Sequence, residues 1–486
     1  MFIGIMLLIP FILSILSLFI RKERVLGITN ASGYGLLLGI AALFTKTFLA
    51  NPQPLSLWGL LYIDALSIFF VLTTAVVAFA ASVYSIAYMR DEIAENKITI
   101  RKAGGYFHLF NLFCFTMLLV PLLNNLALVW IAIEMTTLIS AFLVGFHNVK
   151  ESIEAAWKYI IICSVGITFA LLGIIFFYYT SSTHAGIKSL EWVKMLEGAY
   201  LFEPNIIKIA LLFIFVGYGT KAGFAPMHNW LPDAHSQALS PISGLLSGVL
   251  LKTSLYAILR FVMLANSSVG YAFSARLFIV FGVCSLAIAA GFILVQKDLK
   301  RLMAYHSVEH IGVISVGFGF GLAGGAFGGL LHIFNHAVTK ALMFFCAGNA
   351  VRIYKTNNMS KMQGLMQAAP FTGVIMLFGA LALGGMPPFS IFISEVLILI
   401  AGFSGKHYFI SALMFLFLAI AFAGLVHHVT KIIFGNKPQN IARQKEPLST
   451  KFALLFLGIF ILGLGLKIPQ SFLTLLLNCQ KLVLGQ

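Results

Sequence analysis

The sequence predicts an all-α polytopic membrane protein with about fourteen transmembrane helices. Of its 486 residues, 60% are hydrophobic and only 10% are charged, a balance that soluble globular proteins do not have. Apolar runs of about twenty residues, the length that crosses a bilayer, recur from one end of the chain to the other. The polar segments between these runs are short, so we expect neither a soluble domain nor a long linker.

The first apolar run has no basic segment before it and no small-residue cleavage site, so it reads as a retained first helix. The third and twelfth runs are long enough to be tilted or interrupted. The expected spans are Phe2–Ile20, Leu26–Leu49, Leu60–Met89, Tyr106–Leu123, Leu126–Phe146, Ala155–Tyr179, Ile206–Ala225, Ile242–Leu264, Leu277–Val295, Leu302–Leu322, Ala326–Ala350, Phe371–Ile400, Ile410–Ile433 and Phe452–Leu466. The polar loop Thr180–Pro204 carries enough apolar residues for a short interfacial helix.

The formal net charge of +16 would suggest nucleic acid as a partner of a soluble protein. Here the basic residues gather in short loops, so membrane topology and lipid headgroups explain them better, and we expect no nucleic acid. The loops after odd-numbered spans hold Arg21, Lys22, Arg24, Arg90, Lys97, Arg101, Lys102, Lys150, Lys297, Lys300, Arg301, Arg352, Lys355, Lys361, Lys437, Arg443, Lys445 and Lys451. The other loops hold far fewer. The basic loops are therefore expected in the cytoplasm of a bacterium and the N-terminus in the periplasm, with the chain in the inner membrane.

The five cysteines stand singly, without the C-x-x-C spacing of iron–sulfur, zinc or disulfide sites. The sequence also lacks a Walker motif and a G-x-G-x-x-G that opens a helix after a strand. We therefore expect no cofactor and no metal, and no electron transfer or nucleotide hydrolysis in this chain. The energy for any transport would come from an ion gradient or from partner subunits.

The stretch from Lys221 to Lys252 organises the chain. Lys221 lies near the end of the seventh apolar run. Pro226, directly after the end of that run, removes a backbone hydrogen bond and breaks the helix. Lys252 lies near the middle of the eighth run. A buried ammonium is costly in a membrane and must face protein or water, and a broken helix at that depth lines a cavity or is buried in protein. Two lysines on either side of a break indicate an ion path.

The twelfth run has a second interruption, L-G-G-M-P-P-F-S, followed within two helical turns by Glu395. Interruptions five spans apart fall in helices that cross in opposite directions, which is typical of inverted repeats with sites at the broken helices. We therefore divide the chain into three N-terminal helices (1–105), a first five-helix repeat (106–265), a second, inverted repeat (266–435), and a last transmembrane helix with a short tail (436–486).

Glu134 lies in the fifth run with apolar residues on both sides. It is either a protonated structural group or the partner of a cation, and Lys221 is the natural candidate. A nearby carboxylate would keep the lysine charged, and separation of the pair would favour release of a proton. Such a pair would titrate as a coupled unit.

His332, His336 and Lys340 are spaced four residues apart in the eleventh run, so they share one helix face. Three titratable groups along a stripe favour a proton relay, because imidazole accepts at one nitrogen and donates at the other. The rival interpretation is a zinc site, since histidines at this spacing bind zinc. No H-E-x-x-H motif and no third ligand lies nearby in the sequence.

Further candidates surround these groups. Glu395 is placed to pass a proton toward one face. His306, Glu309 and His310 in the tenth run either widen the relay or tie helices together. His228 and His235, near the basic end of the seventh span, form either a funnel for protons or ordinary interfacial polar groups.

Taken together, these motifs resemble the antiporter-like subunits of respiratory complex I, which share ancestry with Mrp-type sodium/proton antiporters and membrane-bound hydrogenases. The resemblance covers essentially the whole chain and is strongest to the component F type of hydrogenase-4 complexes, through E-A-A-W-K-Y, A-I-E-M-T-T and S-V-E-H. It implies fourteen helices, two inverted five-helix repeats, and protons passing along a polar axis at mid-membrane. Two departures are that His306 stands where a small polar residue is expected, and that no long lateral helix follows the fourteenth span.

By position, the resemblance implies that Glu134 and Lys221 are the pair of helices five and seven, and that Lys252 is the relay lysine of helix eight. The residues of helix eleven would be His332, His336 and Lys340, and Glu395 of helix twelve would be the exit residue. We therefore expect a proton-translocating subunit of a respiratory or hydrogenase-type complex, with other membrane subunits and the lipid bilayer as partners.

Three alternatives remain open at the level of the sequence. The first is an Mrp-type subunit that exchanges sodium for protons along the same relay. The second is the membrane proton channel of an inorganic-carbon uptake complex. The third is a structural scaffold, in which neutralising the relay residues would leave function untouched. The buried charges disfavour it, because charged groups are costly in a membrane.

Overall fold

The computed structural model describes residues 2–439 and 441–485. The first half contains α1 (Phe2–Phe19), α2 (Glu23–Ala50), β1 (Leu55–Leu57), β2 (Leu61–Ile63), α3 (Ala65–Ala94), α4 (Ile100–Leu119), η1 (Val120–Leu122), α5 (Leu126–Val144), α6 (Lys150–His184), α7 (Trp192–Glu197), η2 (Ala199–Leu201), α8 (Pro204–Ala222), α9 (Trp230–Gln237), α10 (Ser240–Leu245) and η3 (Leu246–Leu250). The second half contains α11 (Leu251–Val269), α12 (Tyr271–Val295), α13 (Leu299–Gly319), α14 (Ala323–Tyr354), η4 (Met359–Lys361), α15 (Leu365–Ala368), α16 (Pro370–Leu383), α17 (Ser390–Ser404), α18 (Tyr408–Phe434), α19 (Leu448–Leu466) and α20 (Gln470–Leu484).

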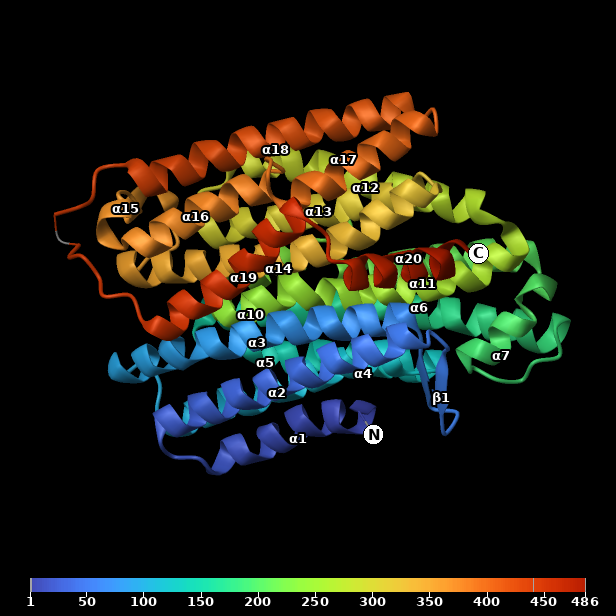
Figure 1. Cartoon of the computed structure of the whole chain (residues 1–486), viewed down its shortest axis with the longest axis horizontal. Coiled ribbons are helices and arrows are strands. Elements are labelled where there is room, and N and C mark those ends of the chain that lie inside the picture. The colour runs from blue at the N-terminus through green and yellow to red at the C-terminus, as the bar shows by residue number, and fades with distance from the viewer. Residues whose placement is uncertain (1, 440, 486) are drawn as a thin grey trace.

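The long helices lie side by side along the horizontal direction of Figure 1, from α1 at one edge to α18 at the other. In the described part of the chain, twelve helices are long and apolar enough to cross a membrane, and α16 and α17 are shorter apolar helices. This confirms the all-α polytopic class. The number of spans, the two inverted repeats and the domain boundaries stay predictions.

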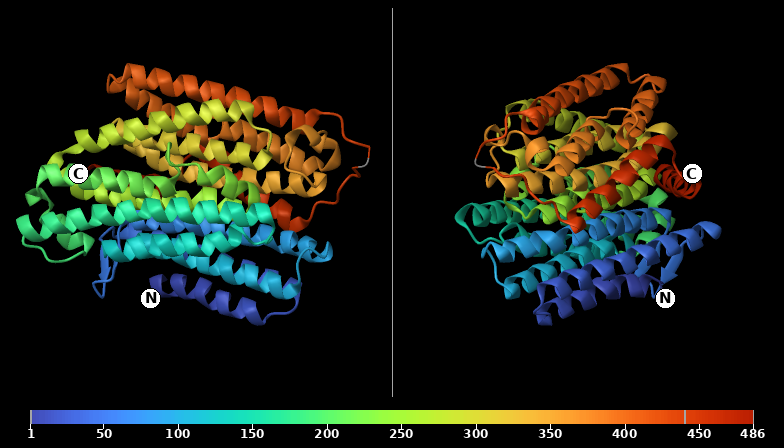
Figure 2. Two further views of the ribbon diagram at one scale, coloured as in Figure 1. Left: turned by 180° about the vertical axis from the view of Figure 1, so that it is seen from behind. Right: turned by 60° about the vertical axis from the view of Figure 1, so that its left-hand side comes forward.

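The basic loop between α18 and α19 lies at one end of the bundle, whereas both labelled termini lie toward the other end (Figure 1, and from behind in Figure 2). The α1–α2 connection, which carries Arg21 and Lys22, lies at the same end as the α18–α19 loop. These two basic loops therefore share one end of the bundle.

Helix α14 lies in the middle of the bundle, packed against α13, α17, α10 and α16. The apolar stretches of α14 and of the α10–α11 segment are 100% buried, whereas that of α18 is 28% buried. Titratable residues on α14 and α11 therefore face protein and not lipid, as charged groups at membrane depth require.

Both expected helix breaks are present. Helix α8 ends at Ala222, and Gly223 caps it with φ of +85°, a backbone conformation that glycine adopts without steric cost. A turn then leads to α9. The twelfth span is divided into α16 and α17, and Gly385 in the break has φ of +68°. Proline and glycine in the two interruptions thus act as the sequence predicts.

A third irregularity was not predicted. The segment Ile242–Leu264 was expected as one continuous helix, but α10 passes through a π-helical turn, η3, before α11 begins. No proline interrupts the L-S-G-V-L sequence of this turn, so its residue types give no warning. Single π turns inside helices occur often at functional sites, and this one ends at Leu250, two residues before Lys252.

The expected start of the third span at Leu60 was wrong, because β1 and β2 form an antiparallel hairpin there and α3 begins only at Ala65. Asp64 caps α3 by accepting a hydrogen bond from the backbone N–H of Ser67 at 2.9 Å. The same carboxylate forms a bidentate ion pair of 2.6 and 2.8 Å with the buried guanidinium of Arg260 on α11. That guanidinium also lies 4.5 Å from the ring of Trp192 on α7, so this one side chain joins the hairpin, α3, α7 and α11.

Helix α7 confirms the short helix expected within Thr180–Pro204. The tail after the fourteenth expected span is also helical: α20 packs against α14 and α3 and buries Leu475, Leu476 and Cys479. These short helices cover the ends and sides of the central helices, which adds burial around α14.

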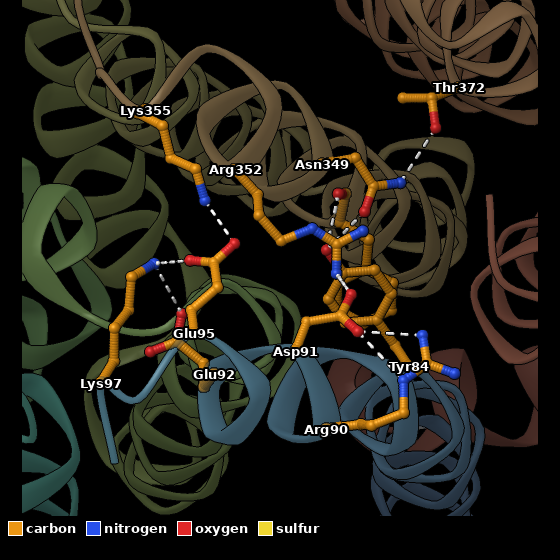
Figure 3. A network of polar contacts seen from close by, with 11 residues as sticks. Tyr84, Arg90, Asp91, Glu92, Glu95, Lys97, Asn349, Arg352, Lys355 and Thr372 are labelled. Carbon is orange, nitrogen blue, oxygen red and sulfur yellow. Dashed lines mark hydrogen bonds and ion pairs between the residues drawn. The ribbon is translucent and has the colours of Figure 1, made fainter. Parts of the chain in front are cut away.

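Polar side chains tie α3 to α14 at the basic end of the bundle (Figure 3). Asp91 of α3 accepts hydrogen bonds from Arg352 of α14 and from Arg90, and Glu95 pairs with Lys355, directly after α14. Lys97 lies 2.8 Å from the other oxygen of Glu95. Hydrogen bonds from Lys355 and Lys97 hold the pKa of the Glu95 carboxyl below its ordinary value.

Candidate functional site

Lys221 lies at the C-terminal end of α8 and is fully buried. Its Nζ donates to the carbonyl oxygen of Ile133 and to the hydroxyl of Thr137, both on α5. Two residues later, Gly223 lies beside Leu251, which directly precedes Lys252. The broken end of α8 thus brings the first lysine close to the helix that carries the second.

The direct ion pair expected between Glu134 and Lys221 is not formed. Glu134 is half-buried on α5 and accepts hydrogen bonds from Ser164 of α6 at 2.7 Å and from Thr137 at 3.1 Å. Thr137 therefore contacts both the carboxylate and the ammonium. The reason is helical geometry, because Thr137 is one turn after Glu134 and lies on the side of α5 that faces Lys221.

A pair of serines lies between the carbonyl groups that accept hydrogen bonds from Lys252 and Lys340. Lys252 donates to the carbonyl oxygen of Ser247 in the π turn, and Lys340 of α14 donates to the carbonyl oxygen of Met303 on α13. The hydroxyl groups of Ser247 and Ser307 are hydrogen-bonded at 2.8 Å, and Ser307 also donates to Met303 at 3.3 Å. Two buried amines thus flank one hydroxyl pair, with neutral oxygen partners in place of carboxylates.

Histidines continue this line from α14 to α17. The ring of His336 lies 4.9 Å from that of His310 on α13, measured between centroids. His310 Nδ1 lies 3.0 Å from His332 Nε2 and 4.0 Å from the Glu395 Oε1 atom on α17. His332 Nδ1 in turn lies 2.9 Å from the Ser394 hydroxyl. Apart from Glu395, which is 7% exposed, these ionisable residues are fully buried.

The sequence placed His332, His336 and Lys340 correctly on one buried face of α14, but it gave His310 too little weight. His310 contacts both histidines of α14 and approaches Glu395, so it is the hub of the cluster. A signal was available: His306, Glu309 and His310 share one face of the tenth span. What the sequence lacked was the information that this face packs against α14.

The accessory residues lie in three different surroundings. His306 Nδ1 lies 2.6 Å from Glu309 Oε2, so these two form a buried pair on α13. His235 is fully buried, and its ring stacks on Phe344 at 4.6 Å, while the Lys340 ammonium lies 4.9 Å from the same Phe344 ring. His228 is buried near Tyr305, with ring centroids 6.0 Å apart, and no contact joins it to the central histidines within the described residues.

A polar cavity of about 400 Å³ opens at the basic end of the bundle, close to His235. Its lining includes Glu92, His147, Lys300 and the segment 236–239 that follows His235. Burial holds the pKa of the loop residue His147 below its ordinary value, against the opposing effect of Glu92. The cavity places water-accessible ionisable groups near the buried line.

Comparison with known proteins assigns the family. The family model described as NADH:quinone oxidoreductase/Mrp antiporter, TM, matches residues 124–422, and a second, NADH-Ubiquinone oxidoreductase (complex I), chain 5 N-terminus, matches residues 53–97. The chain belongs to this family of antiporter-like membrane subunits. The first match contains both broken helices, the π turn and every residue of the buried line.

Relatives and solved structures agree with this assignment. A hydrogenase-4 component F homolog from Methylacidiphilum infernorum (isolate V4) is 34% identical over 424 residues, which cover 87% of this antiporter-like chain and 88% of the relative. A chain of the membrane-bound sulfane sulfur reductase, an archaeal respiratory membrane complex, superposes with a TM-score of 0.88 at 22% identity, over 99% of this chain and 97% of that one. A chain of respiratory complex I from Thermus thermophilus superposes with a TM-score of 0.84 at 21% identity, over the full length of both. The antiporter-like fold and the resemblance to component F are therefore confirmed.

Proposed function

We propose that this chain is the proton-translocating subunit of a respiratory or hydrogenase-type membrane complex. The observation that carries the proposal is the buried line of titratable side chains through an apolar bundle, from Lys221 on α8 to Glu395 on α17. Buried ionisable groups are costly in a membrane, and they are retained where they move ions. The names of the matched family and of the component F homolog place related chains in such complexes.

In this proposal a proton passes from Lys221 to Lys252, and then across the Ser247–Ser307 hydroxyl pair to Lys340. A lysine held only by neutral oxygens releases a proton more easily than one fixed in an ion pair, because no carboxylate stabilises its charged form. Hydroxyl groups both accept and donate hydrogen bonds, so the serine pair suits the crossing between the two amines.

From Lys340 the proton passes through His336, His310 and His332 to Glu395. Imidazole takes up a proton at one nitrogen and gives one up at the other, so the stacked rings provide successive steps. The break before α17 lies beside Glu395, where Met386 is 37% exposed, and gives the carboxylate access to the surface. Glu134 acts as the gate through Thr137.

The 400 Å³ cavity and His235 connect the middle of this line, at Lys340, with the basic end of the bundle. His235 is buried next to that cavity and shares the Phe344 ring with Lys340. By the charge bias of the loops, the basic end lies in the cytoplasm, the N-terminus lies in the periplasm and the chain spans a bacterial inner membrane.

The test uses the intact complex purified through a tag on this chain and reconstituted into vesicles with a pH-sensitive dye. Lys221→Ala should abolish the proton signal while the subunit composition stays unchanged, because the first buried amine is lost. Lys208→Ala is the matched control, since Lys208 is an exposed lysine on the same helix. An unchanged proton signal in Lys221→Ala would refute the relay.

A sodium/proton antiporter subunit is the second candidate, because the description of the matched family also names the Mrp antiporters. The same vesicles separate the two functions. If addition of sodium ions alone, without turnover of the complex, releases protons from acidified vesicles in the parent and not in Lys221→Ala, the relay exchanges sodium for protons.

A further inference from the structure

Three donor atoms from three different helices converge at the end of the buried line. They are Nδ1 of His310 on α13, Nε2 of His332 on α14 and Oε1 of Glu395 on α17, and ligand atoms of these residues all lie within 4.8 Å of one another. The sequence alone disfavoured a metal at His332 because no third ligand was visible near it. The fold brings two further ligands to this histidine from helices 22 and 63 residues away in the chain.

The separations suit a tetrahedral ion. Ligand atoms about 2.1 Å from zinc in tetrahedral geometry lie about 3.4 Å from one another. The two measured separations, 3.0 Å from His310 Nδ1 to His332 Nε2 and 4.0 Å from His310 Nδ1 to Glu395 Oε1, lie on either side of that value. Small rotations of the side chains would bring the three atoms to equal spacing.

The hydrogen bonds around His332 indicate which of its two ring nitrogens carries the free lone pair. With its hydroxyl hydrogen donated to the carbonyl oxygen of Ile391 at 2.9 Å, Ser394 Oγ accepts from His332 Nδ1, 2.9 Å away, and from the Asn335 amide at 3.3 Å. Nδ1 therefore carries the hydrogen and Nε2 carries the lone pair that faces His310 and Glu395. This is the arrangement of a metal-binding histidine whose second nitrogen is held by a neighbouring group.

His310 can offer its lone pair in the same direction. Its Nε2 atom is buried and has no hydrogen-bond partner in the described residues. Without an ion, a hydrogen on one of the two facing nitrogens joins His310 Nδ1 to His332 Nε2 at 3.0 Å. When an ion takes the place of that hydrogen, His310 stays neutral with its hydrogen on Nε2 and turns the Nδ1 lone pair toward the ion. Two neutral imidazoles and one carboxylate are a donor set typical of catalytic zinc sites, with water in the fourth position, and differ from the all-oxygen sets of magnesium and calcium.

We infer that His310, His332 and Glu395 bind a zinc-type divalent transition-metal ion, which blocks the proposed proton path when it occupies these side chains. The binding rests on the geometry alone, and only the block rests on the proposed function. A bound ion commits three relay groups to coordination and leaves them unable to exchange protons. The ion has a way in, because Glu395 lies against Gly385 in the exposed break between α16 and α17.

A second group of possible ligands, His306, Glu309 and His310, shares one histidine with this site. We favour the interhelical set because the lone pair of His332 already faces the other donors. In the second set the Nδ1 of His306 is already hydrogen-bonded to Glu309 at 2.6 Å. Glu309→Gln therefore distinguishes the two sets.

The experiment measures zinc binding to the purified, detergent-solubilised complex by equilibrium dialysis, with cobalt absorption as a second probe. The parent should bind zinc at this site, and Glu395→Gln and His332→Gln should each weaken binding at least tenfold. Ser394→Ala, which removes the hydroxyl that supports His332 but no ligand atom, should weaken it about 10- to 100-fold. Glu309→Gln should bind as the parent does. Subunit composition and thermal midpoint verify that each variant is folded.

His336→Gln separates this inference from the proposed function, because His336 lies in the relay but outside the ligand set. It should lose proton translocation and still bind zinc with the affinity of the parent. In the parent, zinc should inhibit translocation at the concentrations at which it binds. Zinc binding unchanged in both Glu395→Gln and His332→Gln, or lost in Glu309→Gln, would overturn the site. Normal translocation by His336→Gln would count against the relay and leave the site standing.

Discussion

His310 on α13 and His332 on α14 are joined by a 3.0 Å hydrogen bond between Nδ1 of the first and Nε2 of the second. Their ring centroids are 5.1 Å apart, and His336 lies 4.9 Å from the same His310 ring. This contact joins the titratable groups of two helices into one cluster, and Glu395 of a third helix lies within 4.0 Å of it.

Replacing His310 tests whether this hub carries protons. In His310→Gln the side chain keeps hydrogen-bonding groups but loses the ability to take up and release a proton near neutral pH. We expect proton translocation by the reconstituted complex to fall at least tenfold. His427→Gln, an exposed histidine on α18, should translocate at the parent rate. Equal rates for the two variants would remove His310 from the path.

Thr137 is the link between the proposed gate and the first lysine. Thr137→Val keeps the shape of the side chain and removes the hydroxyl that contacts both Glu134 and Lys221. Hydrogen bonds to charged groups contribute about 1.5–3 kcal/mol, so we expect translocation to change by about tenfold or more. Thr168→Val, on the exposed side of α6, is the control and should have no effect. A normal rate in Thr137→Val would mean that Glu134 does not act through this hydroxyl.

The ion pair of Arg260 with Asp64 should be important for stability. Arg260→Met leaves a buried carboxylate without its partner, a change that costs about 3–5 kcal/mol in free energy of unfolding. We expect a clear fall in the thermal midpoint, measured with a thiol-reactive dye that reports exposure of the buried Cys114 and Cys163. Arg276→Met, at an exposed arginine on α12, should unfold at the parent temperature. Identical midpoints for the two variants would contradict a structural role of the pair.

The contact between Glu95 and Lys355 predicts a pH-dependent tie between α3 and α14. Because the pKa of Glu95 is lower in the folded chain than its unfolded value of about 4.3, the contact stabilises the protein above that pH and is lost as pH falls through the folded pKa. Glu95→Gln should therefore unfold slightly earlier than the parent at pH 7, by about 0.5 kcal/mol, because water screens so exposed a pair. The difference should shrink toward pH 4. A difference that stays constant with pH would assign the effect to packing.

Much of the fold could be predicted because its causes are local. Proline and glycine mark the breaks after α8 and α16, and apolar length marks most of the long helices. The β-hairpin was missed because its residues, from Leu55 to Ile63, are as apolar as the start of a transmembrane helix. The π turn was missed because residues that form a π turn also form an α-helix.

The candidate site could be predicted only as far as single helices carry it. The stripe of His332, His336 and Lys340 follows from helical periodicity. The contact of His310 with this stripe depends on how α13 crosses α14, and the placement of Thr137 between Glu134 and Lys221 depends on how α5 packs on α8. Such interhelical contacts leave no periodic trace in one sequence.

The π turn before α11 provides a hydrogen-bond acceptor for a buried lysine. The carbonyl oxygen of Ser247 lies in this widened turn and takes its hydrogen bond from the Lys252 ammonium. A buried ammonium needs acceptors for its hydrogens, and this carbonyl oxygen supplies one from within the chain segment that leads into α11. A movement of this ammonium away from the turn would therefore break a contact that the turn itself provides.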